Sequence, residues 1–228
     1  MLDGDHARLM EAVLPVCHTY GLALAGGYAV KAHGLVDRPS EDIDFATAGT
    51  APLDEIMTAL ADAYRKTDCE VRILDVDARK GHLLVTFPHS ATYRVDVLKE
   101  PLNRPLVMME FGPVIGLSDA VALKMNAFYD RALPRDLLDV HGASACFTGP
   151  DLISLCKSVM DDEFSPEVLR DQLCFAASYP DESFQRYGIQ SDKIAEAKRW
   201  ALEWSQEIGL DMLETEPWSD PGELADEE

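Results

Sequence analysis

Apolar residues recur at helical spacing near the start of the chain and at strand spacing further on. Leu9, Val13 and Val16 repeat near the 3.6-residue period and predict an amphipathic helix over residues 4–20. Residues 53–64 show a second helical pattern. Strands are expected over residues 22–25, 43–46, 70–74, 82–87 and 93–98, with a short piece at 114–115.

The pattern changes to successive helices after residue 117, with proline and glycine marking their starts and breaks. The expected helices cover residues 118–131, 135–146, 150–161, 165–177 and 191–207. We therefore predict an α+β fold, with a small mixed sheet and flanking helices followed by a C-terminal helical bundle. The expected domains are 1–116 and 117–210, followed by an acidic, flexible tail over 211–228.

Composition indicates a globular protein: 47 % of the 228 residues are hydrophobic. The apolar runs are too short to span a bilayer, and the N-terminus lacks the pattern of a secretory signal. The five cysteines include no CxxC pair, which is typical of reduced thiols in the cytoplasm. We therefore expect a cytoplasmic protein without a membrane partner.

The net charge of −21 disfavours broad, nonspecific binding to nucleic acid, which depends on Lys and Arg. Ten of the 41 acidic residues follow Arg199, where there is no Lys or Arg. A local basic groove remains compatible with this charge, and solubility is its simplest interpretation.

Three aspartates on predicted strands suggest a metal site. Residues i and i+2 of a strand share one face, about 6.6 Å apart, so Asp42 and Asp44 project together while Ile43 and Phe45 enter the core. Asp96 lies on another predicted strand, between two valines. Such carboxylates favour Mg²⁺ or Mn²⁺. An isolated acid near a strand end is usually only solvated, so the prediction depends on the combination with the glycine pair upstream.

Two segments carry a family resemblance. GGYAVKAHGLVDRPSEDIDF, residues 26–45, resembles the first motif of the DNA polymerase β-like nucleotidyltransferase superfamily and, more narrowly, that of the AbiEii/AbiGii toxins and their mycobacterial MenT relatives. LKMNAFYDRALPRDLLDV, residues 123–140, is similar to a helical segment of the same group. Together they cover about a fifth of the chain.

The resemblance implies that Asp42 and Asp44 bind the metal that bridges the triphosphate. Asp96 would then hold a second metal or act as base toward the attacking hydroxyl. Gly26 and Gly27 would let the backbone approach the phosphates, although a plain turn after a strand is the alternative.

The same resemblance assigns Ser40 and Arg38 to nucleotide binding. Ser40 matches the serine of the motif, where it would donate a hydrogen bond to phosphate, or it is a turn residue after Pro39. Arg38 would clamp phosphate, or pair with Glu41 or Asp42.

In the second segment, Lys124 matches the lysine of the group and is expected to contact the triphosphate and to complete the catalytic set. Alternatively, Lys124 binds no ligand and its side chain simply extends to water from a largely apolar helix. Arg131 would extend this positive edge. The resemblance also implies a nucleotide-binding role for Asp136 and, less firmly, for Asp139. The alternative for both residues is structural, because acids are also favoured at a helix N-terminus.

The resemblance implies transfer of NMP from an NTP to an acceptor, with the tRNA 3′ end as the expected acceptor and an antitoxin as the expected partner. The cations available for tRNA are Lys31, Arg38, Lys99, Arg104, Lys124, Arg131 and Arg135. Two alternatives stay open. A small-molecule nucleotidyltransferase acting on a cationic antibiotic would suit the acidic surface, whereas a binding module without catalysis would not need all three carboxylates.

Overall fold

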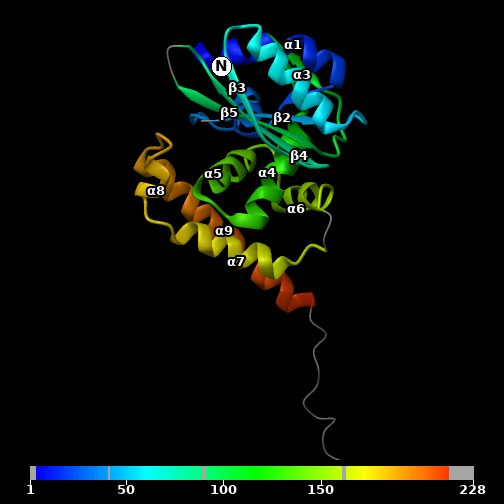
Figure 1. The fold of residues 1–228 in the computed structure, drawn as a ribbon. Helices are drawn as coiled ribbons and strands as arrows, with labels where there is room; N and C mark the ends of the chain where they lie inside the picture. The colour runs from blue at the N-terminus through cyan, green and yellow to red at the C-terminus, as the bar shows by residue number, and fades with distance from the viewer. Residues whose placement is uncertain (1–3, 41, 89–90, 161–162, 216–228) are drawn as a thin grey trace, which may run out of the picture.

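The computed structural model describes residues 4–40, 42–88, 91–160 and 163–215, which adopt the α+β fold expected from the sequence (Figure 1). The strands are β1 (Ala23–Leu24), β2 (Ile43–Thr47), β3 (Glu70–Val76), β4 (Lys80–Thr86), β5 (Thr92–Lys99), β6 (Val107–Met109) and β7 (Gly112–Val114). The helices are α1 (Gly4–Tyr20), α2 (Gly26–Ala32), α3 (Leu53–Arg65), α4 (Leu117–Arg131), α5 (Pro134–Ala143), α6 (Gly149–Lys157), α7 (Pro166–Ser178), α8 (Glu182–Gln185) and α9 (Ser191–Thr215).

The strands form one mixed sheet in the order β3-β4-β5-β2-β1-β7-β6. β2 pairs in parallel with β5, and β1 with β7, while the other neighbours are antiparallel. The register places Asp44 opposite Asp96, and Asp96 in turn opposite His82 on β4. Three adjacent strands therefore carry these side chains at the same level of the sheet.

Helices α1 and α3 cover one face of the sheet, and the bundle α4–α9 lies on the other side of it (Figure 1). Two hydrophobic clusters follow this division, one built from buried residues between Leu9 and Ala120 and one from buried residues between Val121 and Ile208. We propose that they are the cores of the two expected domains.

The described residues differ from the expected elements at a few places. The glycine pair opens helix α2 instead of a simple turn, and α8 and β6 were not anticipated. The first residues of the expected tail belong to α9, which continues to Thr215, and residues 216–228 lie outside the described part. In the described ranges, no helix is both long and apolar enough to cross a membrane.

Candidate active site

Asp42, Asp44 and Asp96 line a single pocket between the sheet and the helical bundle. Ile43 and Phe45, which alternate with the two β2 acids, are fully buried as the strand pattern predicts. The parallel pairing of β2 with β5 brings Asp96 alongside Asp44. The fold thus brings together three carboxylates that are far apart in the sequence.

The glycine pair lies directly against this row of acids. A Cβ atom at Gly26 would be 1.8 Å from Oδ2 of Asp44, and the φ of Gly26 is +57°. A Cβ atom at Gly27 would be 2.6 Å from Oγ of Ser40 and 3.4 Å from a guanidinium nitrogen of Arg38. A side chain at either position would have to displace Asp44 or Ser40, and both glycines line the pocket at the start of α2.

The environment of Asp44 opposes its charge. Burial raises the pKa of the Asp44 carboxyl, Lys124 counteracts the shift, and the carboxylates of Asp96 and Asp42 add to it. A cation among these oxygens would relieve both the burial and the repulsion. The site therefore has the electrostatic character of a cation site.

The Asp96 carboxylate is held by two donors on the sheet. Its Oδ1 lies 2.7 Å from Nδ1 of His82 and 2.7 Å from Nε of Arg94. The hydrogen bond to Asp96 raises the pKa of Arg94 and keeps the guanidinium charged. Among the described residues, no three His, Cys, Asp or Glu side chains are already gathered to hold a metal ion.

The donor chemistry nevertheless fits a divalent cation, because three carboxylates line one pocket and hard oxygen ligands suit Mg²⁺. One oxygen of Asp96 is engaged with His82 and Arg94, so ion binding would compete with these two hydrogen bonds. The metal-binding role of the three aspartates stays a prediction.

A buried ion network holds Arg38 and Lys124, two of the cations that are predicted to bind the nucleotide. Arg38 donates to both carboxylate oxygens of Asp139, over 2.7 and 2.6 Å, and Lys124 Nζ lies 2.8 Å from Oδ2 of the same residue. Arg38 is 5 % exposed, Asp139 is fully buried and the Lys124 side chain is 12 % exposed. Lys124 therefore does not extend freely to water, and Arg38 pairs with a helical acid on α5.

The pKa shifts follow from this geometry. Burial alone would raise the pKa of Asp139, but Lys124 and Arg38 outweigh it and hold the pKa below its ordinary value. Burial similarly opposes the charge of Arg38, yet Asp139 raises the pKa of the guanidinium. Arg38 also lies over the ring of Tyr187, with 5.8 Å between Cζ and the ring centroid. The network fixes two positive groups beside the acids.

A second pair links α4 to α5. Arg131 donates to both oxygens of Asp136, over 2.8 and 3.0 Å. Asp136 is fully buried, whereas Arg131 lines the pocket. Asp136 thus reaches the pocket only through Arg131, and direct contact of Asp136 with a nucleotide remains untested.

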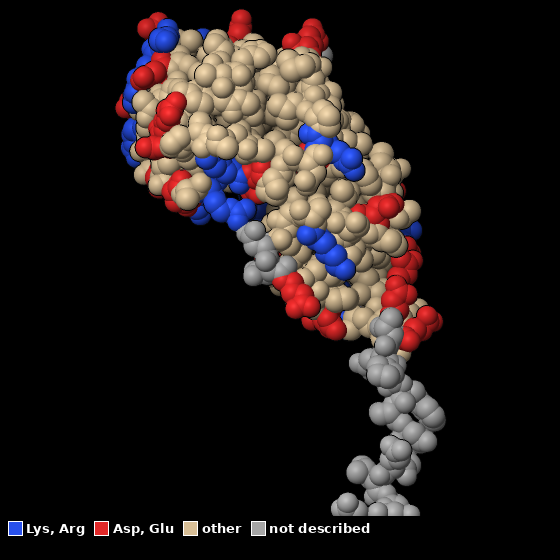
Figure 2. Space-filling view, turned by 90° about the vertical axis from the view of Figure 1, so that its right-hand side faces the viewer, with Lys and Arg blue, Asp and Glu red and all other residues tan. Residues whose placement is uncertain are grey.

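The pocket has a volume of about 460 Å³ and is strongly charged. On the face shown in Figure 2, Lys and Arg side chains gather at the junction of the two halves of the molecule. The acids that line the pocket are Asp42, Asp44, Asp96, Glu100 and Asp130. The cations that line it are Arg38, Lys80, Arg94, Lys124, Arg131 and Arg135.

A model of the AbiEii family, described as nucleotidyl transferase AbiEii toxin of a type IV toxin–antitoxin system, matches residues 8–220. The chain belongs to this family. It is therefore an AbiEii-type nucleotidyltransferase, a toxin of a type IV toxin–antitoxin system.

Solved structures share the fold of this AbiEii protein. MenT4, a nucleotidyltransferase toxin from Mycobacterium tuberculosis, is 20 % identical with a TM-score of 0.59, over 91 % of this chain and 86 % of the other. JHP933 from Helicobacter pylori is 16 % identical with a TM-score of 0.55, over 92 % and 93 %. A putative nucleotidyltransferase from H. pylori is 16 % identical with a TM-score of 0.53, over 93 % and 97 %. No protein of curated function matches the sequence.

The structure places most of the predicted site residues together in this AbiEii pocket. Gly26, Gly27, Ser40, Arg38, Lys124 and Arg131 line it with the three aspartates, whereas Asp136 and Asp139 lie behind it. Of the cations considered for tRNA, Lys31, Lys99 and Arg104 do not line it.

Sequence reasoning missed several side chains that line the AbiEii pocket, among them Lys80, His82, Arg94, Glu100 and Asp130. His82 alternates with the buried Leu83 on β4, so the sequence pattern alone predicts that its side chain lies on the opposite face of the strand. The register that places His82 opposite Asp96 could not be predicted from this pattern, because it depends on the pairing of two strands across a loop.

Proposed function

We propose that this AbiEii nucleotidyltransferase transfers NMP from a Mg²⁺-bound NTP to the 3′ end of a tRNA. The charge of the pocket carries the proposal: the molecule has a net charge of −21, yet six Lys and Arg side chains line the cavity that holds the three aspartates. Five acids line the same pocket, and three of them are the aspartates proposed to bind Mg²⁺. With that charge neutralised, the six cations would attract the phosphates of a nucleotide and of an RNA end and would disfavour a cationic antibiotic.

Asp42, Asp44 and Asp96 would hold Mg²⁺ (or Mn²⁺), which neutralises phosphate charge and stabilises the attacking and leaving oxygens in such reactions. The protein's own contribution is to bind and orient the two substrates. Gly26 and Gly27 would let phosphate approach the start of α2, and the Ser40 hydroxyl, which now donates to the backbone oxygen of Asp42, would donate to it.

Lys124 and Arg38 supply fixed positive charge for the triphosphate, because Asp139 holds both at defined positions. Arg131 and Arg135 extend this charge along the helical side of the pocket. Such preorganised charges need no rearrangement as negative charge develops on the transferring phosphoryl group. Asp96 alternatively accepts the proton of the attacking hydroxyl.

We further propose that a cognate antitoxin accompanies this enzyme, as expected for a type IV toxin. Its site of action would be the cytoplasm, where NTPs and tRNA are available.

The test incubates purified protein and Mg²⁺ with each of four α-labelled NTPs and total tRNA. Asp44→Asn is the inactive variant, and Glu11→Gln, which removes an exposed acid on α1 outside the pocket, is the matched control. We expect label on tRNA with wild type and Glu11→Gln, and a loss of at least about 100-fold with Asp44→Asn.

Thermal unfolding in EDTA accompanies the assay. Because burial and neighbouring carboxylates oppose the Asp44 charge, Asp44→Asn should unfold at the same or a higher temperature than wild type. Unfolding of this variant would make Asp44 a structural residue. Absence of transfer to tRNA, with NTP and Mg²⁺ still bound, would overturn the tRNA proposal and direct attention to small acceptors.

A further inference from the structure

A second cavity of about 320 Å³ lies in the helical half, between α9 and the connection from α5 to α6. It shares no lining residue with the active-site pocket. From α9, Trp200, Glu203, Trp204 and Glu207 line it, and these positions follow one face of the helix. The opposite wall is formed by Ser144, Phe147, Thr148, Gly149 and Leu152.

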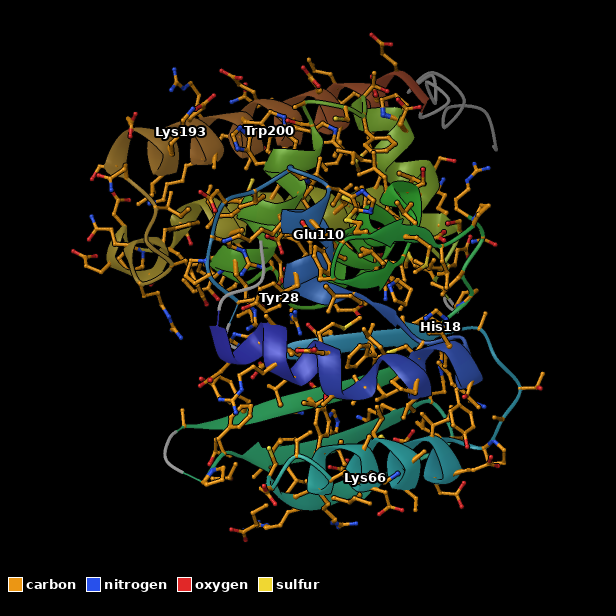
Figure 3. All side chains as sticks on the ribbon, turned by 90° about the horizontal axis from the view of Figure 1, so that it is seen from above. His18, Tyr28, Lys66, Glu110, Lys193 and Trp200 are labelled. Carbon is orange, nitrogen blue, oxygen red and sulfur yellow. The ribbon has the colours of Figure 1, made fainter. Side chains whose placement is uncertain are left out.

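The α9 wall of this cavity carries two indole rings beside the carboxylates of Glu203 and Glu207. The rings of Trp200 and Trp204 have centroids 5.1 Å apart, and the ring of His141 lies 5.4 Å from that of Trp200. Burial lowers the pKa of His141, which leaves its imidazole neutral at neutral pH. Figure 3 shows Trp200 on α9, on the side of the view opposite Lys66 at the end of α3. Indole faces attract cations most strongly among the aromatic side chains.

Two carboxylates stand at the rim of the cavity without a cation. Glu203 and Glu207 are exposed and four residues apart on α9, a spacing at which like charges repel. Neither forms an ion pair with another residue in the described part of the chain, and no Lys or Arg lines the cavity. A cationic group bound here would relieve the repulsion.

The indole of Trp204 adds a hydrogen-bond donor. Trp204 is 6 % exposed, and no residue of the described segments accepts a hydrogen bond from its Nε1. A Cβ atom at Gly149 would be 2.6 Å from Nε1, so the donor edge faces another residue of the cavity wall. Nε1 is not among the fully buried polar atoms without a partner in the described residues, so it is accessible to an acceptor on a bound ligand. A ligand for this cavity should therefore combine a cation with an acceptor such as a carbonyl.

We propose that this cavity binds a Lys or Arg side chain of a partner protein. The ammonium or guanidinium group would lie against the tryptophans and between the two carboxylates, and a peptide carbonyl of the same segment would accept from Trp204. A free polyamine has the cation but no carbonyl. The net charge of −21 attracts a basic partner over longer range. This inference does not depend on the proposed reaction.

The test uses the ¹⁵N-labelled full chain and the indole N–H signals of its three tryptophans. The probes are a short Gly/Ser peptide with one central Arg, the same peptide with Lys, the same peptide with neutral citrulline, and spermidine. We expect the Arg and Lys peptides to shift the Trp204 signal, which Trp204→Phe identifies by removing it. Citrulline and spermidine should bind at least about tenfold more weakly.

The double variant Glu203→Gln/Glu207→Gln should weaken Arg-peptide binding by about tenfold. Glu196→Gln, an exposed acid of α9 that pairs with Lys193 and does not line the cavity, should leave binding unchanged. Three results would overturn the proposal: equal binding of the citrulline peptide, equal or tighter binding of spermidine, or no shift with any probe. Nucleotidyl transfer by the double variant should match that of wild type, which separates this test from the proposed reaction.

Discussion

At the scale of single residues, the Asp44 side chain occupies the space that a side chain at residue 26 would need, and the backbone at Gly26 has a positive φ. Glycine is therefore favoured at residue 26 for two reasons: its backbone has a positive φ, and a Cβ atom there would collide with the Asp44 carboxylate. This coupling explains why the glycine pair and the Asp-Ile-Asp sequence occur together.

Gly26→Ala should abolish most transfer activity, because a Cβ atom 1.8 Å from Oδ2 of Asp44 must displace the carboxylate. Gly34→Ala is the matched control: its φ is +75°, and its Cβ would meet nothing within 4 Å. Both variants should lose about 1 kcal/mol of stability to the left-handed backbone. Urea unfolding and the transfer assay together check this, and equal activity of the two variants would contradict it.

Asp139 is the acid that pairs directly with both Arg38 and Lys124. Asp139→Asn keeps the shape of the side chain but leaves Arg38 and Lys124 without their counter-charge. We expect a loss of about 3–5 kcal/mol at neutral pH, as for other buried pairs that lose one partner.

The sign of the pH dependence follows from the lowered pKa of Asp139. Its charge stabilises the fold above the unfolded-state pKa, near 3.9, and this contribution is lost as the pH falls through the lower folded-state value. The stability difference between wild type and Asp139→Asn should therefore narrow below about pH 4. Denaturant unfolding at several pH values measures it, and a constant difference would exclude a role of the charge.

At the scale of secondary-structure elements, strand register aligns Asp44, Asp96 and His82 in one row, and a capping box begins helix α6 of the bundle. The row depends on three neighbouring strands, β4, β5 and β2. In the bundle, α6 begins with a capping box, in which the Thr148 side chain accepts from Asp151 N and the Asp151 side chain accepts from Thr148 N. The row and the cap lie in different halves of the molecule.

Thr148→Ala should lower stability by about 1 kcal/mol, because the first turn of α6 loses its acceptor. Thr148→Ser keeps the hydroxyl and should remain close to wild type. Transfer activity should be unchanged in both, since Thr148 does not line the active-site pocket. Thermal unfolding and the transfer assay check these expectations, and a loss of activity in folded Thr148→Ala would show that the two halves are coupled.

At the scale of the whole molecule, the charge distribution is the notable property. The chain carries 41 acids against 20 Lys and Arg, yet the pocket at the junction of its two halves is lined by six of those cations. Among them, Arg135 forms no hydrogen bond or ion pair with another described residue and is available to a phosphate. An acidic surface elsewhere would confine RNA binding to this pocket.

Binding of tRNA should therefore weaken as salt rises, because a few phosphates displace their counterions. Arg135→Gln should weaken binding and make the log–log salt slope shallower by about one. Lys66→Gln, at the end of α3 and outside the pocket, is the matched control and should leave the slope unchanged. Filter binding over a salt series measures both, and an unchanged slope for Arg135→Gln would place RNA elsewhere.

The sequence by itself determined the fold class and most of the elements, and it singled out the three aspartates that line the pocket. Local patterns sufficed for α1, α3 and the long strands, because amphipathic periodicity and strand alternation reflect burial of one face. The Asp-Ile-Asp alternation placed Ile43 and Phe45 in the core correctly. The family resemblance supplied the nucleotidyltransferase identity that the family model confirms.

Only the tertiary structure decided which distant groups meet. Asp139 lies 101 residues from Arg38, and nothing in the local sequence distinguishes it from an acid favoured by a helix N-terminus. His82 reaches Asp96 through the register between β4 and β5, whereas Arg94 is two residues from Asp96 on the same strand. Net charge gave no indication that six Lys and Arg side chains gather in one pocket beside five acids, because the sum over a chain does not show where the charges lie. These features depend on contacts between elements, whereas sequence patterns report mainly on each element alone.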